Sequence, residues 1–166
     1  MQLLGSREAI LRAGRTPIDL EEYGSTRDLL ARLQARIQAA PSCGVVHSAA
    51  VGDYEAVPSA EKIPSGRETL TLNLRPTPKI LDAIRGWGLT GPLVSFKAAS
   101  PETTDEALVA IARAQLRRTR SDRVFANVIG RTNSNVFLVD ETEAVRFEAR
   151  ADAIAALQDW LYARLA

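Results

Sequence analysis

Residues 93–127 read LVSFKAASPETTDEALVAIARAQLRRTRSDRVFAN, and this stretch decides the fold class. It opens with an apolar strand at 93–96 and closes with another at 124–127. Between them, residues 103–119 repeat apolar side chains at helical spacing. The apolar side of this predicted helix carries Leu108, Ile111, Ala112 and Leu116. A strand, a long helix and a second strand in this order predict two parallel strands joined by a crossover helix.

The rest of the chain continues this alternation. Short strands are predicted at 2–5, 17–20, 44–51, 69–74, 124–127, 136–139 and 145–147, and further helices at 26–40, about 77–87 and 150–165. Ser25 followed by Asp28 predicts an N-terminal cap for the helix at 26–40. The continuous apolar run at 44–51 predicts a strand buried on both faces. We therefore expect one α/β domain over residues 1–166, a three-layer Rossmann-like fold with a largely parallel sheet.

Composition excludes several classes of protein. The chain carries 21 basic and 20 acidic residues, and this near balance argues against electrostatic binding of nucleic acid. No apolar run approaches the roughly 18–20 residues of a membrane span, and the first residues lack the pattern of a signal peptide. The single cysteine, Cys43, excludes an internal disulfide and fits a reducing compartment. We expect a cytoplasmic protein without nucleic-acid or membrane partners.

Familiar catalytic motifs are absent from the sequence. It contains neither the glycine-rich dinucleotide fingerprint nor a P-loop, and one histidine with one cysteine cannot build an ordinary zinc site. No metal site made by the protein itself is therefore expected. His47 lies within an apolar strand, which favours a hydrogen-bonded core histidine over a catalytic one. Cys43 has no nearby partner of opposite charge and is interpreted as structural.

A long loop, GDYEAVPSAEKIPSGRE at 52–68, follows the apolar strand, where open α/β sheets bind their ligands. Small residues before it allow a ligand to approach the backbone. Asp53 then either accepts hydrogen bonds from a ligand or caps a turn. Lys62 in this loop is either suited to a phosphate or developing anion, or is an ordinary solvated lysine.

Two later strands end in further candidates. Phe96, in the segment SFKA at 95–98, either stacks on a nucleobase or is a core phenylalanine. Asn127 leaves its strand beside a glycine turn in FANVIGRT at 125–132. Its amide either reads a base edge or a carboxylate, or caps the turn. Each of these residues is ambiguous alone, whereas their order along the chain is specific.

Five segments in this order resemble the phosphopantothenoylcysteine synthetase family. They are SAAVGDY (48–54), EKIPSG (61–66), LTLNLRPTPKIL (70–81), LVSFKA (93–98) and RVFANVIGRTNSNVFLVD (123–140). The last segment is more similar to stand-alone synthetases than to bacterial enzymes fused to a flavin decarboxylase. The resemblance implies nucleotide-dependent ligation of 4′-phosphopantothenate to L-cysteine through an acyl-nucleotide, a step of coenzyme A biosynthesis. It also implies CTP or ATP with Mg²⁺ as the cofactors, and a homodimer.

The resemblance assigns roles to individual residues. Lys62 matches the family's loop lysine, a catalytic residue that neutralises negative charge around the acyl-nucleotide. The residues implied in substrate binding, which hold the phosphopantothenate arm, are Ala49, Ala50 and Asp53. The residues implied in nucleotide binding are Ser48, Pro78, Lys79, Phe96 and Asn127.

Two departures from the family pattern qualify this expectation. The family's N-terminal strand, glycine-rich loop and helix have no counterpart in the sequence, so catalysis is expected to require such a segment, either lost from this chain or supplied by a separate polypeptide. Gln115 and Thr119 stand where the fused bacterial enzymes carry lysines, and Arg117, Arg118 and Arg120 nearby fit a solvated helix end. The alternatives are a non-catalytic binding or regulatory relative, and a nucleotide-binding protein with another substrate.

Overall fold

The computed structural model describes residues 1–14, 17–58, 62–63, 65–66 and 68–165. The chain divides into two compact units, each built from two segments. Unit 1 comprises Met1–Arg32 and Ala49–Lys79, and unit 2 comprises Leu33–Ser48 and Ile80–Ala166. The expectation of a single domain stays a prediction. No helix within the described ranges is long and apolar enough to cross a membrane.

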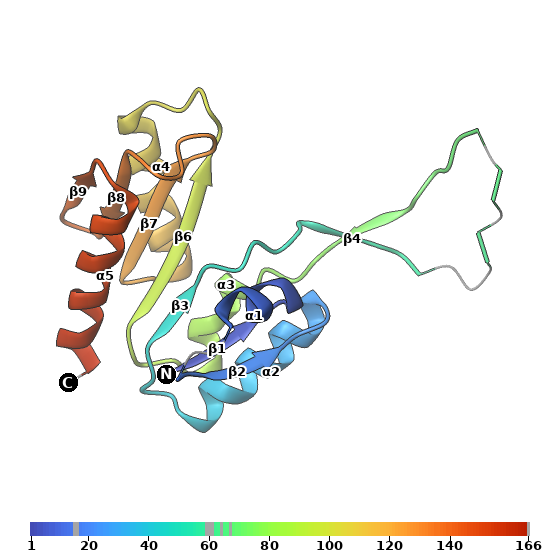
Figure 1. Cartoon of the computed structure of the whole chain (residues 1–166), viewed down its shortest axis with the longest axis horizontal. Helices are drawn as coiled ribbons and strands as arrows, with labels where there is room; N and C mark the ends of the chain where they lie inside the picture. Colours follow the sequence, from blue (N-terminus) through green and yellow to red (C-terminus); the bar gives the residue numbers. More distant parts are fainter. Residues whose placement is uncertain (15–16, 59–61, 64, 67, 166) are drawn as a thin grey trace. The chain divides into compact units, whose positions relative to one another are not determined.

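Unit 2 is organised around a mixed five-stranded sheet (Figure 1). In spatial order its strands are β3 (Val45–His47), β6 (Leu93–Ala99), β7 (Arg123–Val128), β8 (Val136–Val139) and β9 (Ala144–Phe147). The first three are parallel to one another, whereas β8 and β9 pair antiparallel. The α/β class is thereby confirmed.

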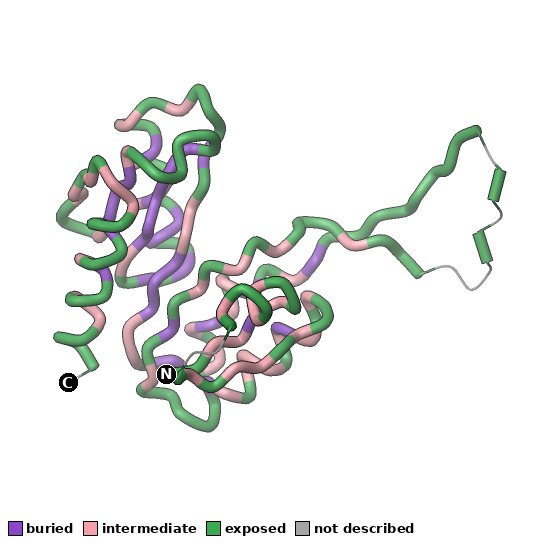
Figure 2. Tube along the Cα trace, in the orientation of Figure 1, coloured by how far each residue is buried: buried purple, intermediate pink, exposed green. Residues whose placement is uncertain are grey.

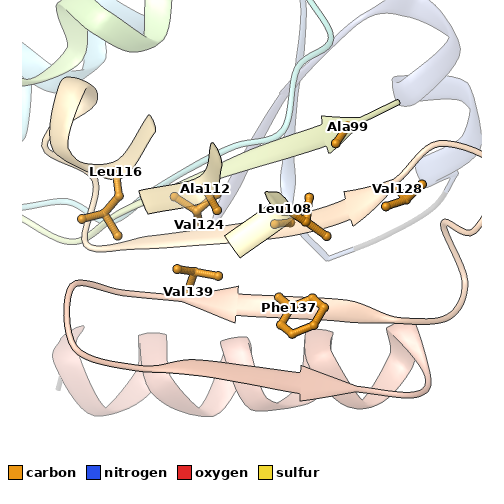
Figure 3. Packing of buried hydrophobic residues seen from close by; sticks show 9 residues of the cluster. Ala99, Leu108, Ala112, Leu116, Val124, Val128, Phe137 and Val139 are labelled. Atoms are coloured by element: carbon orange, nitrogen blue, oxygen red, sulfur yellow. The ribbon is translucent and has the colours of Figure 1, made fainter. Parts of the chain in front are cut away.

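Helices cover both faces of this sheet and make three layers. On one face, α4 (Asp105–Thr119) packs against the strands through a fully apolar cluster (Figure 3). On the other face, α5 (Arg150–Leu165) contributes Ala153 and Leu157 to a second cluster. Burial of each large aliphatic side chain contributes roughly 1.5–3 kcal/mol. Figure 2 shows that the buried residues of unit 2 follow β6 and β7.

The ends of α4 follow from local chemistry. Thr104 caps its start by accepting a 3.3 Å hydrogen bond from the Ala107 N–H, and Asp105 and Glu106 complement the positive end of the helix dipole. Arg120 adopts a left-handed conformation with φ of 53° and ends the helix, its N–H donating to the Leu116 carbonyl. The predicted helix at 103–119 is therefore confirmed with a start two residues later.

Other apolar residues of unit 2 form a third cluster around the first half of the sheet. It joins the end of α2 (Thr26–Ala39) to β3, to the short helix α3 (Ile80–Ala83) and to the 3₁₀ helix η1 (Ile84–Trp87). The predicted cap of α2 is confirmed, because Ser25 Oγ accepts a 3.1 Å bond from the Asp28 N–H. The Asp28 carboxylate in turn accepts a hydrogen bond from the Gly24 N–H. This bond lowers the pKa of Asp28 most, and a hydrogen bond from Arg32 lowers it further.

Arg85 ties the start of β6 to the segment before β7. Its guanidinium donates to the carbonyls of Arg120 at 2.9 Å, Leu89 at 3.0 Å and Gly91 at 2.8 Å. It also pairs at 2.7 Å with Asp122, whose carboxylate accepts from the Leu93 N–H. Charge-assisted bonds of this kind are among the stronger ones in proteins, so Arg85 fixes the N-terminal edge of the sheet.

Unit 1 contains two small sheets. In the first, β1 (Gln2–Gly5) pairs parallel with β2 (Asp19–Glu22) across α1 (Arg7–Ala13), a helix the sequence did not predict. In the second, β4 (Tyr54–Ala56) pairs antiparallel with β5 (Leu74–Pro76). Figure 1 labels β4 in this segment, and we call the described residues around the strand pair, 54–58 and 68–76, the arm.

Three predicted elements need correction. The strand at 69–74 is wrong for 69–73, because within the described chain no neighbouring strand pairs with them. The strand at 44–51 ends at His47, and Val46 is 47% exposed because β3 is an edge strand and not buried on both faces. The helix expected from 77 begins at Ile80, because the Thr77 N–H continues the arm's ladder by donating to the Asp53 carbonyl at 3.0 Å.

Candidate functional site

Unit 2 brings three predicted residues toward one edge of its sheet. Because β3, β6 and β7 are parallel, their C-terminal ends lie at the same edge, which is where α/β sheets bind ligands. Ser48 directly follows β3 and is exposed. Phe96 lies on β6, and Asn127 lies on β7 in register with Ala98. Motifs that are far apart in the sequence therefore place these three residues toward a common edge of the sheet.

Phe96 packs within unit 2. Its ring stacks on that of Phe125, with centroids 4.7 Å apart and planes 19° from parallel. Phe125 is fully buried, whereas Phe96 remains partly exposed and lies against the α5 cluster. The core interpretation of Phe96 is therefore observed, and a nucleobase contact stays a prediction for the part of the ring that is exposed.

Asn127 is buried, with 6% of its surface exposed. Its amide nitrogen donates to the neighbouring Val128 carbonyl at 3.4 Å, a distance at the long limit for such a bond. The turn that follows is relieved by Gly130, which has φ of 86°. Because this hydrogen bond is weak, the Asn127 amide can exchange it for a hydrogen bond to a ligand at little cost in free energy.

Gln115 and Thr119, the positions where the resemblance to the fused bacterial enzymes leads us to expect lysines, belong to a buried polar network. The Gln115 amide donates to Ser95 Oγ at 3.0 Å and to the Phe96 carbonyl at 3.2 Å. Thr119 donates to the Gln115 carbonyl at 2.8 Å and lies 2.7 Å from the Ser121 hydroxyl, which donates to Ser95 at 3.1 Å. These side chains therefore join α4 to β6 in the interior.

The arginines at the end of α4 lie at the other edge of the sheet, because this helix returns the chain to the start of β7. Arg117 pairs with Glu141 at 3.0 Å, and Arg118 pairs with Asp82. Both side chains are more than half exposed. This placement supports their interpretation as a solvated helix end.

Unit 1 holds the remaining predicted residues, and it brings two of them together. The Lys79 ammonium forms an ion pair with the Asp53 carboxylate, so a predicted substrate residue contacts a predicted nucleotide residue. Both side chains are exposed, and such pairs contribute about 0–1 kcal/mol to stability. The hydroxyl of Thr77 donates to the Gly52 carbonyl and holds this end of the arm.

The other predicted residues of unit 1 lie along the same segment. Ala49 and Pro78 are half-buried, and Ala50 is exposed. Lys62 is exposed, and its neighbours Glu61 and Pro64 in the EKIPSG motif lie outside the described residues. The structure therefore does not place Lys62 against any other predicted residue.

His47 and Cys43 are partly buried. Burial lowers the pKa of His47, so its ring is neutral near pH 7. The predicted hydrogen bond of this histidine is not found within the part of the chain that the structure describes. Cys43 packs against the cluster around Leu93, and burial raises the pKa of its thiol, which fits a structural and unreactive cysteine.

Sequence reasoning missed Lys97 as a candidate. It lies on β6 between Phe96 and Ala98, is partly buried, and has neither an ion pair nor a hydrogen bond within the described ranges. The signal was present in the composition, because Lys97 is one of only three lysines among 21 basic residues.

Comparison with known proteins adds a family to this geometry. The sequence model for the DNA/pantothenate metabolism flavoprotein C-terminal domain matches residues 12–159. The coenzyme A biosynthesis bifunctional protein CoaBC of Thermococcus kodakarensis is 34% identical over 122 residues, which are 71% of this chain. The chain spans only 30% of the length of that relative.

Solved structures show the same fold. The DNA/pantothenate metabolism flavoprotein from Streptococcus pneumoniae superposes with a TM-score of 0.78 and 25% identity, covering 94% of this chain and 84% of that one. A Cab2 H337A mutant in complex with phosphopantothenate-cysteine gives a TM-score of 0.63 at 23% identity, covering 87% of this chain and 54% of that one. At that identity the second likeness concerns the fold alone.

Proposed function

The chain belongs to the DNA/pantothenate metabolism flavoprotein C-terminal domain family, and from this premise we propose that it acts in coenzyme A biosynthesis. The proposed reaction joins 4′-phosphopantothenate to L-cysteine and consumes CTP or ATP. The geometric observation that carries the proposal is the common sheet edge of Ser48, Phe96 and Asn127 in unit 2. Relatives that are named for this pathway, including CoaBC, support it.

The proposed chemistry solves a specific difficulty. A carboxylate is a poor electrophile, so its oxygen first attacks the α-phosphorus of the nucleotide, and pyrophosphate leaves. The amine of cysteine then attacks the acyl carbon, forms the amide, loses a proton and expels the nucleoside monophosphate. Both steps build up negative charge on phosphate oxygens, which positioned cations and N–H donors stabilise.

Residues of unit 1 are proposed to hold the acyl substrate. Ala49 and Ala50 are small enough to leave their backbone accessible, and Asp53 offers a carboxylate to hydroxyl or amide groups of the pantothenate arm. Lys62 is proposed as the catalytic cation that neutralises the acyl-nucleotide. The exposure of Lys62 supports this role, because an exposed side chain is accessible to a ligand.

For the nucleotide, the proposed residues are those that the family resemblance implies in each unit taken by itself. The residues proposed to hold it are Ser48, Pro78, Lys79, Phe96 and Asn127. Phe96 contributes the exposed part of its ring to the base, and Asn127 contributes its weakly bonded amide. Among the described residues no cluster of three acidic, histidine or cysteine side chains could hold a metal. We propose that Mg²⁺ is bound mainly through the triphosphate, as is usual for this ion.

A homodimer is proposed through the arm. Residues 69–74 alternate leucine with threonine or asparagine and carry no charge. Leu70, Leu72 and Leu74 are 49%, 54% and 58% exposed, and beyond Asn73, whose carbonyl accepts from the Val57 N–H at 2.9 Å, no strand of the described chain pairs with residues 69–72. An uncharged, exposed segment with strand periodicity favours pairing with an identical segment of a second copy around a two-fold axis.

The test of function is pyrophosphate release. Purified protein is incubated with phosphopantothenate, cysteine and Mg²⁺, separately with CTP and with ATP, and each reaction is repeated without phosphopantothenate. Release that requires phosphopantothenate establishes the ligase and identifies its nucleotide. A folded protein that binds nucleotide but releases no pyrophosphate would refute ligase activity of this chain alone, and would mean either that catalysis needs the additional N-terminal segment or that the chain is a binding or regulatory relative.

A further inference from the structure

Lysine is rare in this chain, and each of its three positions lies in a segment that carries the family resemblance. Of 21 basic residues only Lys62, Lys79 and Lys97 are lysines, and the others are arginines. Lysine and arginine are not equivalent, because an ammonium is a compact point charge whereas a guanidinium is a planar fork. Lys62 and Lys79 already have proposed ligand roles, which leaves the third lysine without one.

Lys97 occupies an open stretch of the sheet. On one side it is in register with Ala126 of β7. On the other side β3 pairs with β6 only from Leu93 to Ser95, and no strand of the described residues continues beside Phe96–Ala99. A strand that outlasts its neighbour at the C-terminal edge leaves room there for a ligand.

The face on which Lys97 lies follows from its neighbours at alternate positions. Ser95 accepts a hydrogen bond from Gln115 of α4, and Ala99 packs in the cluster formed with α4. Lys97 lies between them and therefore shares the face covered by α4. It is placed where a long side chain can extend along an apolar surface and present its ammonium at the edge.

The charge of Lys97 has no partner in the described chain, in contrast to several arginines of the same unit. Arg85, Arg118 and Arg123 each pair with a carboxylate. Lys97 is partly buried as a residue, and an ammonium with no counter-charge in the described chain can pair with an anionic ligand without first breaking an ion pair.

We propose that Lys97 binds a phosphate group of the substrates. The identity of the ligand rests on the proposed function, in which the nucleotide and phosphopantothenate both carry phosphate. The existence of an anion site at this open stretch rests on the placement of Lys97 alone.

The test compares three variants with the wild-type protein by isothermal titration calorimetry. Lys97→Met removes the charge and keeps the length, Lys97→Arg keeps the charge, and Arg117→Met removes an exposed charge from the same unit as a control. The probes are Mg²⁺–CTP, Mg²⁺–ATP, phosphopantothenate and inorganic pyrophosphate, each titrated alone. Thermal unfolding checks that every variant is folded, and Lys97→Gln replaces Lys97→Met if the latter does not fold.

We expect Lys97→Met to weaken binding of pyrophosphate and of one substrate by about tenfold or more, because a lost charged hydrogen bond has this order of effect. The affinity of Lys97→Arg should lie between those of the wild type and Lys97→Met, and the affinity of Arg117→Met should equal that of the wild type. The substrate that is affected identifies the source of the phosphate. One outcome separates the two proposals. If the wild type binds pyrophosphate but neither the nucleotides nor phosphopantothenate, and Lys97→Met no longer binds pyrophosphate, the anion site is supported and the proposed function is refuted. Unchanged affinities in Lys97→Met, or no binding of any probe by the wild type, would overturn the site.

Discussion

Lys62 is the residue on which the proposed chemistry depends most directly. Replacing it with alanine should reduce turnover by about 10²–10³-fold, the usual effect of removing one positioned electrostatic donor. Because the side chain is exposed, the melting temperature should stay within about 1–2 °C of wild type, as is typical of surface substitutions. Pyrophosphate release and thermal unfolding measure the two effects.

A matched control for Lys62 is available in the same unit. Arg12 is 80% exposed and, among the described residues, pairs with Glu8 one helical turn away, so Arg12→Ala should leave turnover unchanged. A Lys62→Ala variant that loses stability in proportion to its activity would make the lysine structural.

His47 gives folding stability a defined pH dependence. Burial lowers the pKa of its imidazole below the value of about 6.5 in an unfolded chain. As the pH falls through 6.5, the unfolded chain takes up a proton that the folded protein does not, so the free energy of unfolding decreases. His47→Gln should remove this part of the decrease. Urea unfolding at pH 7.5 and 5.5 measures it.

The comparison is clean because His47 is the single histidine. Carboxylates contribute equally to both proteins, so the difference between their pH responses belongs to this ring. An equal loss of stability in the wild type and in His47→Gln would show that the ring protonates as readily in the folded protein as in the unfolded one.

Among the elements, α4 and β6 are joined by the network around Gln115. Gln115→Lys, which introduces the residue type that the resemblance to the fused bacterial enzymes leads us to expect here, should destabilise the protein by about 2–4 kcal/mol, because it buries an ammonium and removes the amide that donates to Ser95. Ala114→Lys on the exposed side of the same helix should change stability by no more than about 0.5 kcal/mol. Chemical unfolding compares the two. A stable Gln115→Lys variant with increased nucleotide affinity would mean that this position faces the site.

How far elements can be predicted from the sequence depends on how much of each one is buried. The helix α4 has both a buried stripe and caps, so its pattern and its ends were readable. The helix α1 was missed because it is only 7 residues long and none of them is fully buried, so its apolar residues Ala9, Ile10 and Ala13 make too short a pattern to distinguish a helix. The segment 69–74 was assigned to a strand from its alternation alone, and alternation cannot say where the partner strand is.

The candidate site divides in the same way. The identity and order of Ser48, Asp53, Phe96 and Asn127 could be predicted because they belong to motifs. Whether a side chain is buried and hydrogen-bonded in the interior could not be predicted, because this depends on neighbours from distant parts of the chain. Gln115 meets Ser95 only in three dimensions, and Lys97 is distinguished by the strand that ends beside it.

For the whole molecule, the proposed dimer has a direct test. The double variant Leu70→Asp with Leu72→Asp places two negative charges beside their own copies across the two-fold axis and should convert the dimer to a monomer. Sedimentation equilibrium at micromolar concentration measures the mass. Leu11→Asp changes a leucine on α1 that is 73% exposed and should leave the mass unchanged. A monomeric wild type, or a double variant that stays dimeric, would refute the arm as the interface.

The pairing of β3 also governs how the chain folds while it is being synthesised. Val45 pairs with Leu93, which emerges from the ribosome 48 positions later. At translation rates of roughly 5–20 residues per second, β3 waits several seconds without its neighbour. During that interval Ile37 and Val45, which are buried in the folded protein in one cluster with Leu93, lack this partner on the nascent chain. Production of this protein is therefore expected to depend on chaperone capacity before the second half of the sheet has been translated.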